Sequence, residues 1–186
     1  MADVAHLQNR MTPDEYLTAE AAAEHKSEYV NGWLFGMAGT TNRHAVIAGS
    51  LTIALGPTLK RSCQFFLSDT KVRIRKAEET FYYYPDFHIT CGGFEPGSQY
   101  NENPVFICEV LSPSTARADR REKFDNYKTI PTLQEYMLID QDIPKVELFR
   151  RSTGWVLELY TRGHVIHLDS IGQDLAISDL YARVDY

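Results

Sequence analysis

Apolar and polar positions recur with helical spacing in three segments of the chain. The first opens with Thr12-Pro13-Asp14-Glu15, where Thr12 can cap a helix and Glu15 completes a capping box. Either Thr41 or Asn42 caps the second, whose apolar positions are too many for a narrow stripe and so predict burial on a wide face. The expected helices are 12–24, 42–59 and 116–128.

Runs with strand character separate these helices. Asn31-Gly32 supplies the two positive-φ positions of a type I′ turn, so residues 28–35 are expected to form a hairpin. Residues 105–111 are strongly apolar and carry one charge, Glu109. The other expected strands are 63–67, 72–74, 81–90, 135–140, 145–149 and 155–160, with a Gly/Pro/Asn-rich loop at 91–104 and weak signals in 164–186.

Length and composition favour one globular domain. The 186 residues, 44% of them hydrophobic, fit a flexible N-terminus at 1–11 followed by a single α/β (α+β) domain at 12–186. The net charge of −6 argues against a general nucleic-acid coating protein but leaves room for a local basic groove. Candidates for such a groove are Lys60, Arg61, Lys71, Arg73, Arg75 and Lys76.

The cysteines do not suggest a disulfide scaffold. Cys63, Cys91 and Cys108 are too few and too far apart for a disulfide framework or a metal clip, and a core of this size needs no disulfide. Cys108 lies in an apolar run and reads as a buried small hydrophobe. No signal-peptide pattern and no membrane-spanning stretch is visible, so we expect a cytoplasmic protein without membrane association.

Two carboxylates fall in segments that otherwise read as strand. Asp86 follows Pro85, and Glu109 comes 109 − 86 = 23 positions later. A carboxylate buried in a strand is costly unless it is paired or bound to a cation, and two close carboxylates stay ionised only beside strong positive charge. Their oxygen ligands suit Mg²⁺ or Mn²⁺. The alternative is that Glu109 pairs with an arginine such as Arg73 or Arg117.

The helix after Glu109 places Asp119, Lys123 and Tyr127 at i, i+4 and i+8 on one face. This face can point to the carboxylates and bring Lys123 beside a metal ion. The alternative is a solvated Asp–Lys pair on a surface helix. The arginines of this segment fall on the opposite side and are expected to be solvated: Arg117, Arg120 and Arg121.

Several short motifs carry a family resemblance. Tyr84-Pro85-Asp86, Glu109-Val110-Leu111-Ser112-Pro113 and Pro131-Thr132-Leu133-Gln134-Glu135-Tyr136 resemble the Uma-type family of bacterial restriction-endonuclease-like proteins, long labelled a domain of unknown function. The resemblance covers roughly residues 12–149. It implies a PD-(D/E)xK nuclease-like fold, a restriction-endonuclease-like core with a central mixed sheet flanked by helices.

The resemblance also implies roles for particular residues. Asp86 matches the motif aspartate and Glu109 the motif glutamate. Leu111 replaces the lysine expected at the third position, and the family pattern moves that lysine onto the following helix, which here means Lys123. Glu28 looks like the superfamily's N-terminal acidic residue, with a surface glutamate at a hairpin edge as the alternative.

The implied cofactor is Mg²⁺ or Mn²⁺, held by Asp86, Glu109 and the carbonyl of Val110. His44, Asp119 and Tyr127 are candidate supporting residues. For His44 the alternative is a purely structural histidine near the start of a helix.

The expected function is metal-dependent endonucleolytic hydrolysis of nucleic acid, with DNA as the first candidate. A homodimer is also expected, because residues 155–160 could form an apolar edge or exposed face that a second copy of the chain would cover. Two alternatives remain open. One is a degenerate nuclease fold that acts as a nucleic-acid or protein binding module. The other is a metal-dependent hydrolase of small phosphoesters.

Overall fold

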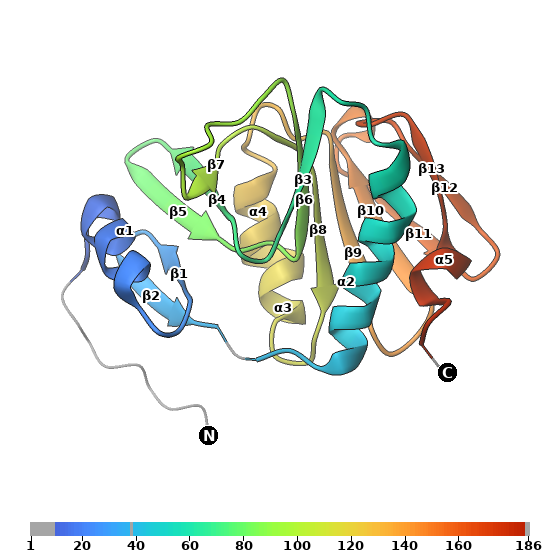
Figure 1. Cartoon of the computed structure of the whole chain (residues 1–186), viewed down its shortest axis with the longest axis horizontal. Helices are drawn as coiled ribbons and strands as arrows, with labels where there is room; N and C mark the ends of the chain where they lie inside the picture. Colours follow the sequence, from blue (N-terminus) through green and yellow to red (C-terminus); the bar gives the residue numbers. More distant parts are fainter. Residues whose placement is uncertain (1–9, 38, 185–186) are drawn as a thin grey trace.

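The computed structural model describes residues 10–37 and 39–184 (Figure 1). Its helices are α1 (Pro13–Ala22), α2 (Asn42–Leu55), α3 (Ala116–Ala118), α4 (Phe124–Tyr127) and α5 (Ile177–Tyr181), with 3₁₀ turns η1 (Gly56–Thr58) and η3 (Arg151–Thr153) and a π-helical turn η2 (Asp119–Lys123). Its strands are β1 (Ser27–Val30), β2 (Trp33–Gly36), β3 (Cys63–Leu67), β4 (Lys71–Lys76), β5 (Glu79–Tyr83), β6 (Phe87–Cys91), β7 (Tyr100–Asn101), β8 (Pro104–Leu111), β9 (Glu135–Asp140), β10 (Lys145–Arg150), β11 (Leu157–Thr161), β12 (Val165–Leu168) and β13 (Gln173–Ala176).

Two larger sheets and one small hairpin organise these strands. The six-stranded sheet has the order β11-β10-β9-β8-β6-β3, with β8 and β9 parallel and the other neighbours antiparallel. The five-stranded sheet has the order β2-β1-β5-β4-β7, and β12 pairs with β13. The segment from α3 to α4 connects the parallel strands β8 and β9. The expected α+β architecture with a mixed sheet is confirmed.

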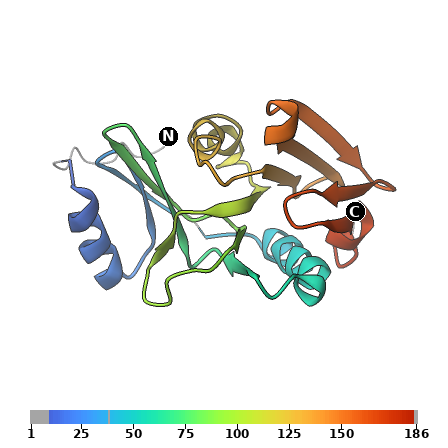
Figure 2. The same ribbon diagram turned by 90° about the horizontal axis from the view of Figure 1, so that it is seen from above.

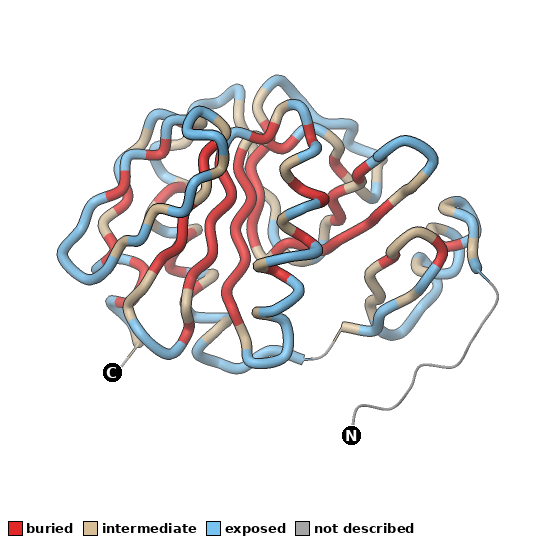
Figure 3. Tube along the Cα trace, turned by 180° about the vertical axis from the view of Figure 1, so that it is seen from behind, coloured by how far each residue is buried: buried red, intermediate tan, exposed pale blue. Residues whose placement is uncertain are grey.

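Helices cover both faces of the six-stranded sheet (Figure 2). On one face, Ile47, Leu51 and Leu55 of α2 pack with α5 and the β12–β13 hairpin in the largest apolar cluster. On the other face, Tyr127 of α4 packs in a second cluster that also takes side chains from β4 and β5. The central strands are therefore buried along their length (Figure 3), which explains why residues 105–111 are nearly all apolar.

The N-terminal segment packs on the far face of the five-stranded sheet. Thr12 and Glu15 form the expected capping box of α1, and Tyr16 stacks on Tyr29 in an aromatic cluster. Of the predicted flexible segment 1–11, residues 1–9 lie outside the described residues. Met11 is not free, because its N–H donates to the Gly32 carbonyl at 3.1 Å and its carbonyl accepts from the Tyr29 hydroxyl at 2.7 Å.

The residue types at turns and helix starts predicted the first hairpin and the start of α2 correctly, but they missed the boundary between β5 and β6. Asn31 and Gly32 have φ of 45° and 100°, as the predicted hairpin turn requires, and Thr41 caps α2. The single strand expected at 81–90 is wrong: β5 and β6 belong to different sheets. The chain leaves one sheet and enters the other around Pro85, which has no N–H to donate to a strand ladder.

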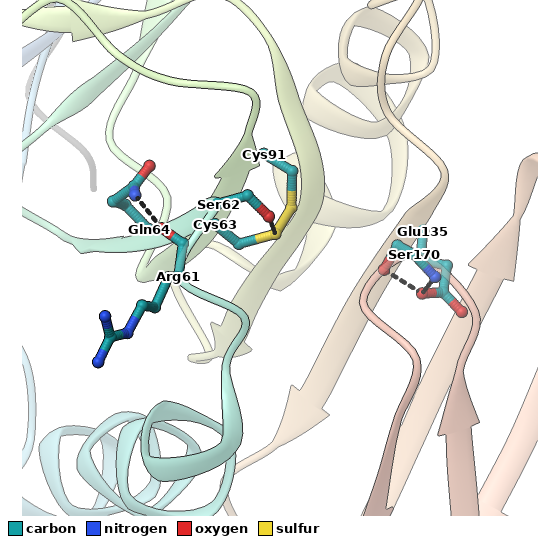
Figure 4. Close-up of a disulfide and its surroundings, with 7 residues drawn as sticks. All are labelled: Arg61, Ser62, Cys63, Gln64, Cys91, Glu135 and Ser170. Carbon is teal, nitrogen blue, oxygen red and sulfur yellow. Dashed lines mark hydrogen bonds between the residues drawn. A yellow bond between two sulfur atoms is a disulfide. The ribbon is translucent and has the colours of Figure 1, made fainter.

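The C-terminal segment contains more structure than its weak signals indicated. Beyond β11 the chain forms the β12–β13 hairpin and α5, which close the main apolar cluster. The buried carboxylate of Glu135 holds the loop between β12 and β13 by accepting the backbone N–H groups of Asp169 at 3.2 Å and Ser170 at 3.0 Å. Figure 4 shows the Glu135–Ser170 contact.

A disulfide joins Cys63 and Cys91 (Figure 4), a pairing that the spacing of the cysteines in the sequence did not suggest. The two cysteines lie directly opposite each other at the ends of antiparallel β3 and β6, although 28 positions separate them in the sequence. Cys108 is a free, buried cysteine, as predicted. No helix within the described ranges is long and apolar enough to cross a membrane.

Candidate active site

The two carboxylates predicted to lie together are neighbours at one end of the β6–β8 ladder, where Asp86 directly precedes β6 and Glu109 belongs to β8. Phe87 pairs with Cys108 in the β6–β8 ladder, so Asp86 stands beside Glu109 at the next position. The Asp86 N–H donates to Glu109 Oε2 at 3.2 Å, and the Val110 N–H donates to Asp86 Oδ2 at 2.7 Å. These reciprocal bonds fix both carboxylates at one level of the sheet.

Lys123 brings three carboxylates together. Its Nζ lies 2.9 Å from Glu28 Oε1, 3.3 Å from Glu109 Oε1 and 3.4 Å from Asp119 Oδ1. The Lys123 and Asp119 side chains are only 9% and 2% exposed, so the alternative of a solvated surface pair is wrong. The arginine alternative for Glu109 is also wrong, because the side chains that contact its carboxylate are those of Lys123 and Tyr127, the latter through its hydroxyl at 3.1 Å.

The helix that carries Asp119, Lys123 and Tyr127 contains a π-helical turn between the first two. Such turns are rare and often occur at functional sites. All three side chains are buried on the predicted shared face. The arginines behave differently: Arg117 and Arg121 are exposed as expected, whereas Arg120 binds the buried Glu147 of β10 through two hydrogen bonds of 3.0 and 2.9 Å.

Glu28 and His44 join the cluster from two further elements, β1 and α2. Glu28 projects from β1 and also accepts the Tyr84 N–H at 3.1 Å, so the surface-glutamate alternative is wrong. His44 lies in the first turn of α2, and its Nε2 is 2.9 Å from Asp86 Oδ1. Its Nδ1 is buried and has no hydrogen-bond partner among the described residues. The structure therefore brings together the side chains that the sequence nominated for the metal site and its support: Glu28, His44, Asp86, Glu109, Asp119, Lys123 and Tyr127.

Negative charge exceeds positive charge in this cluster. Four carboxylates (Glu28, Asp86, Glu109 and Asp119) face one ammonium group and one imidazole. Burial raises the pKa of Glu109 well above its usual range despite Lys123, and burial also raises the pKa of Asp119. Burial by itself lowers the pKa of Lys123. The carboxylates of Glu109, Glu28 and Asp119 outweigh this effect and raise the pKa well above the ordinary value.

The donor chemistry fits a hard divalent cation. The cluster has excess negative charge, and Asp119 Oδ1 is buried without a hydrogen bond of good geometry, although Lys123 is near. Within residues 10–37 and 39–184, no three His, Cys, Asp or Glu side chains are spaced to enclose a metal ion. A cation beside Asp86 and Glu109 would therefore complete its shell with water, as Mg²⁺ commonly does.

Three residues of the basic groove suggested by the sequence, Lys71, Arg73 and Arg75, lie away from this site. Arg73 pairs with Tyr82 across β4 and β5, on the face of the sheet opposite to Glu28. There Arg73 contacts Glu102 at 2.7 Å, and Arg75 contacts the same carboxylate at 3.4 Å. Lys71 is buried on that face and donates to the Tyr84 hydroxyl at 3.1 Å.

Sequence reasoning missed the role of Tyr84 in positioning the site. Its N–H holds Glu28, and its hydroxyl donates to Glu20 at 2.8 Å. Any residue except proline can donate a backbone N–H, so the sequence could not predict the contact between the Tyr84 N–H and Glu28. The neighbouring Pro85-Asp86 marked the segment but gave no indication that β1 passes beside it.

Comparison with known proteins supports the resemblance. The sequence pattern of the Uma2 family, described as "Putative restriction endonuclease", matches residues 13–178. The chain is 31% identical over 176 residues to the uncharacterised protein slr1290 of Synechocystis sp., covering 92% of each chain. It is 37% identical over 145 residues to sll1609 of the same organism, covering 76% of this chain and 81% of that protein.

A solved structure has the same fold. It is the crystal structure of a "putative nuclease" from Anabaena variabilis, which superposes with a TM-score of 0.72 at 20% identity over 92% of this chain and 98% of the other. At that identity the likeness concerns the fold. The match of the family pattern to nearly the whole sequence shows that this chain belongs to the Uma2 family.

Proposed function

We propose that this protein is a divalent-metal-dependent endonuclease that hydrolyses phosphodiester bonds, with DNA as its first candidate substrate. The observation that carries the proposal is the convergence of Glu28, Asp86, Glu109 and Lys123 in one buried cluster, in which carboxylates outnumber positive groups. Family membership supports the same reaction class.

Asp86, Glu109 and the Val110 carbonyl are the groups that would hold Mg²⁺ or Mn²⁺. A bound divalent ion supplies charge for the phosphoryl oxygens and lowers the pKa of a water molecule. Asp86 is held for this task by the Val110 N–H at 2.7 Å and His44 at 2.9 Å. Glu109 is held by Tyr127 at 3.1 Å. These contacts fix the carboxylates before any ligand arrives, which reduces reorganisation.

Lys123 is the group that would stabilise negative charge on the phosphorus centre in the transition state. Its ammonium group stays protonated because three carboxylates surround it, so it acts through its charge and hydrogen bonds. Glu28 and Asp119 orient that ammonium group, and Glu28 is in turn fixed by the Tyr84 N–H.

The test is cleavage of supercoiled plasmid and of labelled oligonucleotides during titration with Mg²⁺ and Mn²⁺. The wild type is expected to cut only with metal, and Glu109→Gln is expected to lose activity by orders of magnitude because a ligand charge is removed. Glu78→Gln makes the same change at an exposed turn and is the matched control.

A wild-type protein that binds no divalent ion by calorimetry at millimolar concentrations and cuts neither DNA nor RNA would overturn the proposal and favour a binding module. Cleavage of a small phosphodiester without cleavage of nucleic acid would favour the small-phosphoester reading. Unchanged activity in Glu109→Gln would place the chemistry elsewhere.

A further inference from the structure

Strand β2 presents two large aromatic side chains to solvent. Trp33 is 37% exposed and Phe35 is 52% exposed. Neither belongs to any of the three apolar clusters formed by the described residues, whereas Leu34 between them packs against the aromatic cluster beneath α1. Exposed aromatic rings that share one face of a strand often mark a contact surface.

The strand register places these rings on the face that carries Glu28. Phe35 lies directly opposite Glu28, and Trp33 lies opposite Val30. Directly opposed residues in an antiparallel pair point to the same face, with Cβ atoms about 5 Å apart. Since Glu28 reaches Lys123 at 2.9 Å, Phe35 borders the candidate active site and Trp33 continues the same face along the hairpin. The hairpin projects at one side of the molecule (Figure 1).

The spacing and surroundings of the two rings suit nucleobases. Residues two apart on a strand are about 6.7 Å apart, close to twice the roughly 3.4 Å rise of a stacked nucleic-acid strand, so one base fits between two such rings. The guanidinium group of Arg10, an exposed residue, lies 6.0 Å from the centre of the Trp33 ring, where it can meet a phosphate.

We propose that Trp33 and Phe35 form a stacking platform for unpaired bases of the strand whose phosphodiester lies at Lys123 and Glu109. This inference rests on the proposed function and narrows it to single-stranded or locally unpaired nucleic acid. Bases inside a duplex cannot stack on protein rings without leaving their neighbours. The platform therefore acts in substrate positioning and leaves the chemistry to the acidic cluster.

Trp33 offers a signal that does not depend on cleavage. The chain has two tryptophans, and Trp155→Phe leaves Trp33 as the only indole. In a buffer that contains Ca²⁺ in place of Mg²⁺, this variant is titrated with a short single-stranded oligonucleotide. A second titration uses the same strand carrying abasic sites. The intact strand is expected to quench Trp33 fluorescence and to bind about tenfold or more tightly than the abasic strand.

Substitutions at Phe35 separate stacking from simple apolar contact. Phe35→Leu keeps an apolar side chain and is expected to weaken binding of the intact strand about tenfold, whereas Phe35→Tyr keeps the ring and is expected to retain affinity. Phe94→Leu is the control, since Phe94 is a 46% exposed aromatic residue on the loop after β6.

The outcomes distinguish this inference from the proposed function. Base-dependent quenching without cleavage in Mg²⁺ would support the platform and remove the nuclease proposal. Cleavage with equal affinity for intact and abasic strands would keep the nuclease and overturn the platform. A change of particle mass in Phe35→Leu with unchanged oligonucleotide affinity would assign this face to contact with a second copy of the chain and also overturn it.

Discussion

At the scale of single residues, the site depends on one ammonium group shared by three carboxylates. Lys123 lies within 3.4 Å of Glu28, Glu109 and Asp119, and its side chain is 9% exposed. The buried ammonium group of Lys123 therefore stabilises the fold in addition to its role in the proposed reaction. Buried carboxylates that lose their counter-charge are strongly destabilising.

Lys123→Met is therefore expected to lower the free energy of unfolding by about 3–5 kcal/mol in metal-free buffer. Urea titration followed by circular dichroism measures the change. Lys128→Met removes an exposed pair with Asp125 and should change stability by less than about 1 kcal/mol. Equal effects of the two substitutions would show that the cluster does not need the charge of Lys123.

Glu109→Gln is expected to have the opposite effect on stability. The change removes one anion from a crowded cluster and keeps the size of the side chain, so the metal-free variant should be at least as stable as the wild type. Thermal melts in chelator-containing buffer test this. A fall of several degrees in Tm would mean that the Glu109 charge is needed to hold Lys123.

The sequence was sufficient to nominate these residues but not their contacts. Carboxylates within strand-like runs indicated Asp86 and Glu109, and helical spacing indicated Asp119 and Lys123. The contact between Lys123 and Glu28 joins residues 123 − 28 = 95 positions apart. Spacing along one element cannot reveal it, because it depends on how two sheets meet.

At the scale of elements, the helix that carries Lys123 is anchored to the sheet by Arg120 and Glu147. The hydrogen bonds from Arg120 lower the pKa of Glu147 below its usual range. A depressed carboxyl pKa adds stability above the unfolded value of about 4.3, and that stability is lost as the pH falls through the lower folded value.

Glu147→Gln should therefore lower the free energy of unfolding by about 1 kcal/mol at pH 7 and by less as the pH falls below about 4. Urea titrations at several pH values measure the difference, and Glu78→Gln at an exposed turn is the control. A difference that stays constant across this range would argue that Glu147 is not held by charge.

The disulfide between β3 and β6 gives a second prediction at this scale. Removing it with Cys63→Ala and Cys91→Ala together should lower the free energy of unfolding by about 3 kcal/mol, because a loop of 28 positions is no longer closed in the unfolded chain. Urea titration of oxidised protein measures this loss. A reducing agent should destabilise the wild type and leave the double variant unchanged.

Elements with local signals were predictable, and those that depend on distant partners were not. Thr12 and Asn31-Gly32 mark a helix start and a turn by backbone chemistry alone. The pairing of Cys63 with Cys91 depends on strand register, which no local pattern encodes. Strand β12 alternates exposed and buried residues over only four positions, which is too short to stand out in a sequence.

At the scale of the whole molecule, β11 forms one edge of the six-stranded sheet. Apolar side chains near this edge are 47–62% exposed: Val156, Leu157, Leu159 and Val165. An exposed apolar edge strand is a surface that a second copy of the chain can cover. The homodimer remains a prediction, as does the cytoplasmic location.

Light scattering should give a mass of twice 21.3 kDa for the wild type, and Leu159→Lys should reduce it to that of one chain. Ile53→Lys changes a similarly exposed apolar residue on α2 and should leave the mass unchanged. A wild-type particle of 21.3 kDa at high protein concentration would contradict the dimer.

The distance in sequence between Glu28 and Lys123 has a consequence during protein synthesis. At roughly 5–20 residues per second, the ribosome needs about 5–20 s to make the 123 − 28 = 95 residues between them. During that time the hairpin that bears Glu28 has emerged or is emerging, while the lysine that binds it does not yet exist. A truncated chain released early cannot assemble the acidic cluster, so incomplete translation products should lack the proposed nuclease activity.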